Sequence, residues 1–296
     1  MSKDPQSQKE LAAFAYGFLG VLIFSLTLPS TRIAVSGFDP VFVGLGRAIV
    51  AAGLSLILIV VTRQTIPPLR SLPSFCIVVA GVVIGFPLLS AIAMRDAPAS
   101  YGAVITGLLP LSTALFGVWR AGERPSVQFW IFAGLGSALI VGFALLSGSG
   151  TIRMADLALL AAVGAAGLGY AEGAVLSRTF GSWQVICWSL ILSTPFLLPI
   201  VLQHAPSDFS SVSFGAVMGF LYVSIFSMFL GFFAWYRGLS LGGIARVGQV
   251  QLLQPFLTIL ASALFLDEHL TITTLGFAVG VIACVALGKR TQITAT

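Results

Sequence analysis

The chain has 296 residues, of which 57% are hydrophobic and 8% are charged, and its formal net charge is +5. Soluble domains carry roughly 25% charged residues, so the composition excludes an ordinary soluble protein. The apolar runs are about 18 to 24 residues long, which is the length of a helix that crosses a bilayer, whereas barrel strands need only about 9 to 11. The sequence therefore predicts an all-α integral membrane protein.

These runs predict ten transmembrane helices joined by short polar connections. In chain order we expect helices at residues 11–35, 40–61, 73–94, 97–119, 127–146, 154–177, 183–202, 214–236, 244–265 and 271–288. The first run is longer than the roughly 7 to 15 apolar residues of a signal peptide. We therefore expect it to remain in the protein as the first span.

Lysine and arginine are distributed unequally between the connections. Three of them fall on one side of the predicted bundle, namely Arg32, Arg95 and Arg153. Eleven fall on the side of the N terminus, namely Lys3, Lys9, Arg63, Arg70, Arg120, Arg124, Arg178, Arg237, Arg246, Lys289 and Arg290. Because cytoplasmic loops are enriched in positive residues, this asymmetry predicts a multi-pass inner-membrane protein with both termini in the cytoplasm.

A segment of the second half repeats a segment of the first half at an offset of 145 residues. Pro255 corresponds to Pro110, and Glu268 corresponds to Glu123. Each repeat then holds five spans, and an odd number of spans inserts the second copy upside down. We therefore expect two inverted five-helix repeats, at residues 11–147 and 154–288, around a central cavity, with cytoplasmic tails at 1–10 and 289–296.

The two prolines predict where the binding site lies. Proline inside a helix leaves the carbonyl four residues earlier without its donor, and here those carbonyls belong to Thr106 and Gln251. Broken helices in paired repeats are typical of transporter sites. We expect Gln251, Gln254 and Thr106 to bind polar groups of a substrate. The alternative is that they only join helices by hydrogen bonds, which average about 0.6 kcal/mol in membranes.

Two ionisable residues fall inside predicted spans, Arg47 in the second and Glu172 in the sixth. Inserting a charge at mid-span costs roughly 2.5 to 3.5 kcal/mol, so such groups generally face a cavity or a partner. For Arg47 the alternative is a side chain that extends to the membrane interface. For Glu172 we expect a cavity or proton-linked role, with an ion pair to Arg178 as the alternative.

The aromatic residues nearest polar or broken helix segments are Phe24, Tyr101, Tyr170, Trp188, Tyr222, Trp235 and Tyr236. The candidates for the site among them are Phe24, Tyr101, Tyr170 and Trp235. We expect them to line the apolar part of the cavity, which would suit apolar or aromatic small molecules. Tyr101 and Trp235 could equally anchor span ends at the membrane interface.

The sequence contains no arrangement typical of an enzyme. Its two histidines, His204 and His269, fall in loops, and no nucleophile and base share a depth in the membrane. The three cysteines lack the paired spacing of a metal site or disulfide framework. We expect no catalysis, no metal and no cofactor. Because there is no basic block or basic helix, we expect no nucleic-acid partner.

The chain resembles the EamA-type drug/metabolite transporter superfamily, in its ten-span form with two EamA repeats. The resemblance rests on the fourth span of each repeat, which runs from proline through small and apolar residues to glutamate and precedes a glycine-rich fifth span. It implies export of small metabolites through a cavity lined by spans 1, 3, 4, 6, 8 and 9. The chain looks most similar to exporters of aromatic and other neutral amino acids, since sugar-phosphate relatives need several basic groups there and only Arg47 qualifies.

The expected function is therefore export of small neutral metabolites, amino acids included, by alternating access of a monomer in the lipid bilayer. One alternative is a proton-coupled exporter of other small drugs or metabolites. From a different class, the alternatives are an intramembrane enzyme, which needs a reactive pair at one depth, and a seven-span receptor, whose termini lie on opposite sides.

Overall fold

The computed structural model describes residues 5–122, 126–147 and 153–289, and helices are the only regular secondary structure in them. The first half contains α1 (Pro5–Ser25), α2 (Thr27–Ala34), α3 (Pro40–Val61), η1 (Leu69–Ser71), α4 (Leu72–Val78), η2 (Val79–Gly85), α5 (Phe86–Asp96), α6 (Ala99–Thr106), α7 (Leu109–Ala121) and α8 (Val127–Ser147). The second half contains α9 (Met154–Phe180), α10 (Ser182–Gln203), η3 (Phe209–Ser211), α11 (Phe214–Leu221), η4 (Tyr222–Leu230), α12 (Gly231–Gly242), α13 (Ile244–Val247), η5 (Gly248–Leu253), α14 (Gln254–Leu266) and α15 (Ile272–Lys289).

Helices occur at each of the ten stretches that the sequence predicts. Seven of these stretches are long and apolar enough to cross a membrane, namely Gln8–Ala34, Pro40–Val61, Leu69–Asp96, Ala99–Arg120, Met154–Phe180, Ser182–Gln203 and Phe214–Gly242. Two apolar helices of the searched residues are shorter, Val250–Leu266 and Ile272–Cys284. The all-helical architecture is confirmed, and the count of ten spans stays a prediction.

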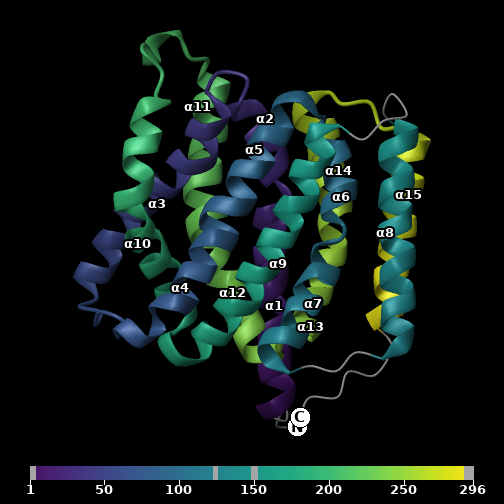
Figure 1. Ribbon diagram of the computed structural model, residues 1–296, viewed down its shortest axis with the longest axis horizontal. Coiled ribbons are helices and arrows are strands. Elements are labelled where there is room, and N and C mark those ends of the chain that lie inside the picture. Colours follow the sequence, from purple (N-terminus) through teal and green to yellow (C-terminus); the bar gives the residue numbers. More distant parts are fainter. Residues whose placement is uncertain (1–4, 123–125, 148–152, 290–296) are drawn as a thin grey trace.

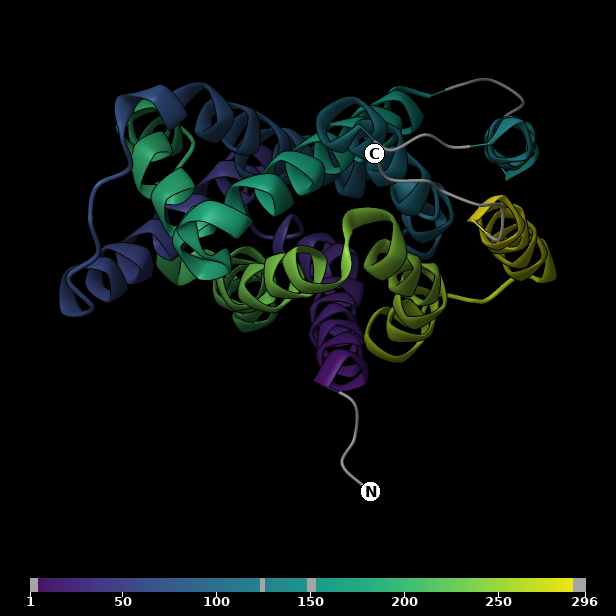
Figure 2. The ribbon, with the colours of Figure 1, turned by 90° about the horizontal axis from the view of Figure 1, so that it is seen from below.

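The helices stand side by side in one bundle. In Figure 1, α6 and α7 run downward while α13 and α14 run upward beside them, so the two broken stretches are antiparallel neighbours. α8 and α15 pack against each other at one edge of the bundle, and Figure 2 shows this pair at the same end in the second view. The middle of the bundle is therefore built from the other helices.

The prolines mark true breaks in the fourth and ninth stretches. α6 ends at Thr106 and α7 carries Pro110 in its first turn, whereas α13 passes through the 3₁₀-helix η5 before α14, which carries Pro255 in its first turn. The expectation that Pro255 frees the carbonyl of Gln251 is wrong. The tighter winding of η5 lets this carbonyl accept the N–H of Gln254, three residues later.

The two halves correspond in finer detail as well. α7 and α14 both end on a residue in the left-handed conformation, Gly122 with φ 68° and Asp267 with φ 52°. Both third stretches contain a π-helix, η2 and η4, and Val82 and Ser227 occupy corresponding positions in them at the 145-residue offset. The wide turns of π-helices occur frequently at functional sites. Glu123, the counterpart of Glu268, lies outside the described residues.

Glycines allow the closest helix contacts at the centre. A Cβ atom on Gly81 of η2 would come within 2.5 Å of the carbonyl oxygen of Ala165 in α9. A Cβ atom on Gly238 of α12 would come within 2.8 Å of the backbone nitrogen of Gly17 in α1. Small residues of this kind let membrane helices approach closely. They bring η2 against α9 and α12 against α1 at the centre of the bundle.

Candidate functional site

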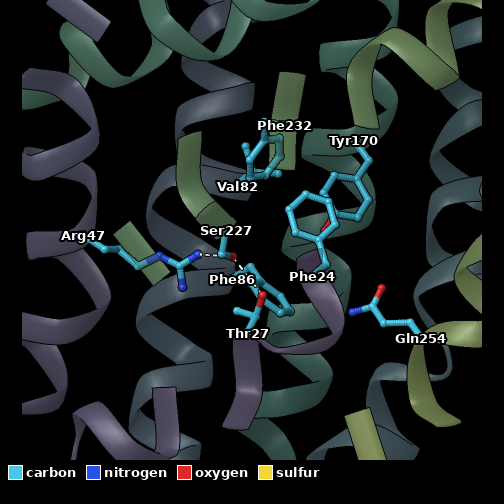
Figure 3. A pocket seen from close by; sticks show the side chains of 9 residues that line it. All are labelled: Phe24, Thr27, Arg47, Val82, Phe86, Tyr170, Ser227, Phe232 and Gln254. Carbon is cyan, nitrogen blue, oxygen red and sulfur yellow. Dashed lines mark hydrogen bonds between the residues drawn. The ribbon is translucent and has the colours of Figure 1, made fainter. Parts of the chain in front are cut away.

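A small cavity lies at the centre of the bundle, between the two halves. Nine residues line it (Figure 3): Phe24, Thr27, Arg47, Val82, Phe86, Tyr170, Ser227, Phe232 and Gln254. They come from stretches 1, 2, 3, 6, 8 and 9 of the chain. The space open to the centre of a water molecule is about 10 Å³, which is room for about one water. In this conformation the cavity is closed around its own side chains.

One side of the cavity is aromatic. The ring of Phe24 in α1 stacks on that of Tyr170 in α9, with centroids 6.3 Å apart and planes 11° apart. Phe232 packs against both rings, at 5.2 Å from Phe24 and 6.1 Å from Tyr170. Trp235 lies behind this group, fully buried, with its ring 5.6 Å from that of Tyr170. Three of the four aromatic residues predicted for the site therefore lie together.

The other side of the cavity carries a chain of polar groups. Arg47 Nη2 donates to Ser227 Oγ at 2.9 Å, and this hydroxyl lies 2.8 Å from Thr27 Oγ1. Figure 3 shows the guanidinium of Arg47 reaching from α3 toward these two hydroxyls. Arg47 is only 2% exposed, so it contacts neither lipid nor water at the bundle surface. The alternative of a side chain that extends to the interface is therefore wrong.

Both glutamines are buried, but they are placed differently. Gln254 lines the cavity, and its Oε1 has no hydrogen-bond partner among the described residues. Gln251 is 1% exposed and does not line the cavity. Neither its Nε2 nor its Oε1 has a hydrogen-bond partner among the described residues. One turn after Gln254, Thr258 Oγ1 donates to the carbonyl of Ser25 at 2.8 Å and so joins α14 to α1. A role in joining helices by hydrogen bonds therefore fits Thr258 better than it fits Gln251 or Gln254.

Two residues named from the sequence lie apart from the cavity. Thr106 is buried, and its hydroxyl donates to the carbonyl of Ala103 in its own helix. Tyr101 donates to Asp156 Oδ1 at 2.6 Å, and the guanidinium of Arg153 lies over its ring. Together with Glu268, Tyr101 lines a separate pocket of about 390 Å³ at the start of α6. The structure does not bring either residue to Phe24 and Tyr170.

Glu268 caps the start of α6 in this second pocket. Its carboxylate accepts the backbone N–H groups of Ala99 at 2.8 Å and Ser100 at 2.9 Å. These are N–H groups of the first helical turn, which have no partner inside the helix, and the helix dipole favours a negative charge there. Glu268 therefore ties the end of α14 to the start of α6.

Glu172 is fully buried in α9 and pairs with Arg120 at the end of α7. Arg120 donates to both carboxylate oxygens, from Nε to Oε2 and from Nη2 to Oε1, the latter at 2.8 Å. The alternative pair with Arg178 is wrong because six residues along a helix turn a side chain by about 240°, away from its starting face. Glu172 is not among the residues that line the central cavity.

Sequence reasoning missed two of the three members of the polar chain, Thr27 and Ser227, and three other lining residues, Val82, Phe86 and Phe232. The 145-residue repeat offset could have pointed to two of these residues, because it places Val82 and Ser227 at corresponding positions. Serine and threonine are ordinary in membrane helices, where they mostly bond to their own backbone. The hydroxyls of Thr27 and Ser227 stand out only in the structure, where they lie beside Arg47.

The sequence matches the EamA-like transporter family twice, over residues 11–147 and 153–288. It is similar to the "Uncharacterized transporter YdeK" of Bacillus subtilis (strain 168), with 49% identity over 93% of this chain and 96% of that protein. It is also similar to the "Uncharacterized transporter YvbV" of the same organism, with 25% identity over 95% of this chain and 92% of that protein.

A solved crystal structure shares the fold, with a TM-score of 0.67 over 93% of this chain and 97% of that chain. Its sequence identity is 15%, so it shows the fold alone. The family match spans nearly the whole chain, and a central cavity between its two halves agrees with it. The chain is therefore a multi-pass membrane transporter that belongs to the EamA-like transporter family.

Proposed function

We propose that the protein exports small neutral metabolites, amino acids including aromatic ones, across the inner membrane by alternating access of two inverted repeats. The observation that carries this proposal is the central cavity, where residues of both halves meet. Phe24 in α1 and Tyr170 in α9 come from the first helix of each half, and their rings stack on each other there. A site on the axis between inverted repeats can open to either side by rocking of one half against the other.

The side chains around the cavity support a substrate with an apolar body and a few polar atoms. Four of the nine lining residues are aromatic, and only one is charged. Aromatic walls with few well-placed polar groups are typical of small-molecule sites. Phosphorylated substrates fit less well because a phosphate carries a charge of about −1.5 to −2 at neutral pH. Neutral amino acids, with one carboxylate and one ammonium group, match this balance better.

Counterflow in liposomes tests the proposal. The purified protein is reconstituted in liposomes loaded with unlabelled L-phenylalanine, and uptake of labelled L-phenylalanine, L-leucine and L-lysine is measured. We expect accumulation of the two neutral amino acids over L-lysine. Folded protein that gives no counterflow of either neutral amino acid would contradict the proposed substrate class.

Gln254→Leu is the matched variant, because Leu109 occupies the corresponding place in the first repeat. We expect counterflow to fall at least about tenfold, since an amide hydrogen bond to a charged substrate group contributes about 1.5 to 3 kcal/mol. Gln251→Leu is the comparison and should act more weakly, since Gln251 does not line the cavity.

Proton-coupled export is the second candidate, and the buried carboxylate of Glu172 favours it. Intramembrane acids commonly mark ion or proton pathways. A pH gradient across the liposome should then drive uptake by the native protein, and Glu172→Gln should abolish that dependence while leaving counterflow intact. If a pH-driven flux persists in the variant, Glu172 has a structural role only.

A further inference from the structure

The guanidinium of Arg47 is a buried positive charge that no acid among the described residues neutralises. Arg47 is 2% exposed and makes one hydrogen bond, from Nη2 to Ser227 Oγ. Its Nε and Nη1 are buried and have no partner among the described residues. Its side chain lines the central cavity, and it is the only charged one among the nine described lining residues (Figure 3). The cavity is therefore lined by a cationic side chain that has two unused N–H donor atoms, Nε and Nη1.

The buried acids of the described ranges are engaged elsewhere. Glu172 pairs with Arg120, and Asp156 accepts from Tyr101 and lies 3.6 Å from Arg153. None of the ion pairs formed within those ranges includes Arg47. α10 is the helix of the second half that corresponds to α3, and it contains no Lys, Arg, Asp or Glu. The cavity consequently holds a single cation, without a counterpart across the repeat axis.

An isolated buried charge is among the most costly groups in a membrane protein, and it is retained where a partner neutralises it. A water molecule in the cavity would satisfy an N–H group of Arg47, but it would leave the positive charge in place. A carboxylate would do both, because guanidinium and carboxylate form short, charge-assisted hydrogen bonds. Since the described residues supply no such group, the cavity calls for an anionic group from a ligand.

The rest of the cavity limits what else this anion can carry. Phe24, Tyr170 and Phe232 offer an apolar wall beside the cation. The unpartnered Oε1 of Gln254 is a neutral acceptor, which can accept from an ammonium group without requiring one. A ligand of this site therefore needs a carboxylate, whereas an amino group on it is accepted but not needed.

We infer that Arg47 is the carboxylate-binding residue of the transport site and that substrates are small monocarboxylates with an apolar body, with or without an amino group. This inference rests on the proposed transport function and specifies which substrate group the site recognises. Amines that lack the carboxylate are poor ligands, and so are dianions such as phosphate esters, because one cation neutralises one charge.

Three probes that share one aromatic body test the inference. L-phenylalanine carries both charged groups, 3-phenylpropanoate carries only the carboxylate, and 2-phenylethylamine carries only the ammonium. Dissociation constants are measured by calorimetry on the purified native protein, on Arg47→Met, and on Arg70→Met, which removes an exposed arginine of η1 as a control for net charge. Thermal unfolding of each ligand-free variant is recorded in parallel.

We expect the native protein and Arg70→Met to bind both acids at least tenfold more tightly than 2-phenylethylamine. Arg47→Met should weaken both acids by about 10- to 100-fold and leave the amine unchanged. Its ligand-free unfolding temperature should not fall, because the substitution removes an uncompensated buried charge. A purely structural Arg47 would show the opposite pattern, with lower stability and unchanged discrimination between acids and amine.

Folded Arg47→Met that binds 3-phenylpropanoate as tightly as the native protein would overturn the inference. If Arg47→Met does not fold, Arg47→Lys decides, and it must weaken 3-phenylpropanoate more than the amine. Counterflow separates the proposed transport function from the role of Arg47. If the native protein and Arg47→Met carry L-phenylalanine equally, the transport function stands and the role of Arg47 falls. If the native protein carries none of the three probes, the proposed substrate class itself fails.

Discussion

The rings of Phe24 and Tyr170 stack 6.3 Å apart across the middle of the bundle, and each residue lies in the first helix of its half. The contact therefore joins α1 to α9 at the point where the halves must separate for a substrate to enter. Both residues also line the cavity, so a substrate that enters must take the place of part of this contact.

Phe24→Leu keeps the apolar volume at this contact and removes the ring. We expect transport of L-phenylalanine to fall about 2- to 10-fold relative to L-leucine, because aromatic pairs contribute about 0.5 to 1.5 kcal/mol beyond the area that they bury. The measurement is the ratio of initial counterflow rates for the two amino acids. An unchanged ratio would show that the substrate does not contact Phe24.

The ion pair between Arg120 and Glu172 predicts an asymmetric response to mutation. The side chain of Arg120 is 31% exposed and that of Glu172 is 1% exposed. Arg120→Ala leaves a buried carboxylate unpaired and should lower the free energy of unfolding by about 3 kcal/mol. Glu172→Gln leaves a charge that reaches solvent and should cost about 1 kcal/mol. The double variant should recover most of the loss from Arg120→Ala, as measured by thermal unfolding in detergent.

Equal losses for the two single variants would contradict this account. So would a double variant that is no more stable than Arg120→Ala, because the loss would then come from packing and not from an unpaired charge.

Asp267 and Gly122 give a matched test of backbone strain, because both end a helix in the left-handed conformation. A side chain costs about 1 kcal/mol there and glycine avoids this cost. We expect Asp267→Gly to raise the free energy of unfolding by about 1 kcal/mol and Gly122→Ala to lower it by a similar amount. Thermal unfolding of both variants checks the pair, and a loss of stability in Asp267→Gly would mean that its side chain contributes more than the strain costs.

The contact between Glu268 and the start of α6 predicts how easily that end of the protein opens. Removing a side chain that caps a helix start costs about 0.5 to 2 kcal/mol. Glu268→Ala should therefore increase the reaction rate of a thiol reagent with Ser100→Cys about 2- to 30-fold, in a background without Cys76, Cys187 and Cys284. Glu268→Gln retains an accepting oxygen and should give a smaller increase. Equal rates in all three backgrounds would remove Glu268 as a closing contact.

Local signals in the sequence predicted a large part of this architecture. Apolar run length indicated the helices, and Pro110 and Pro255 indicated where two of them break, because proline acts on the backbone within one turn. Gln254 and Arg47 were named because polar and charged groups are costly in lipid, and both line the cavity.

Partners between helices were not predictable in the same way. Arg120 and Ser227 lie 52 and 180 residues from the groups that they bind, and their contacts depend on how each helix is rotated. The π-helix η4 changes that rotation for every residue after it, and it leaves no pattern that periodicity can detect. Tyr101 was predicted to line the cavity and does not. It is nine residues from Pro110, but at about 1.5 Å per residue this places it roughly 13 Å along the helix from the break.

The closed cavity, with space for about one water, has a consequence for measured affinities. If only a fraction of molecules is open at any moment, the apparent dissociation constant equals the intrinsic constant divided by that fraction. Binding experiments on the resting protein will then report contact energy and the free energy of opening together. A residue remote from the substrate, such as Glu268, can consequently tighten apparent binding when it is removed, although it touches no ligand.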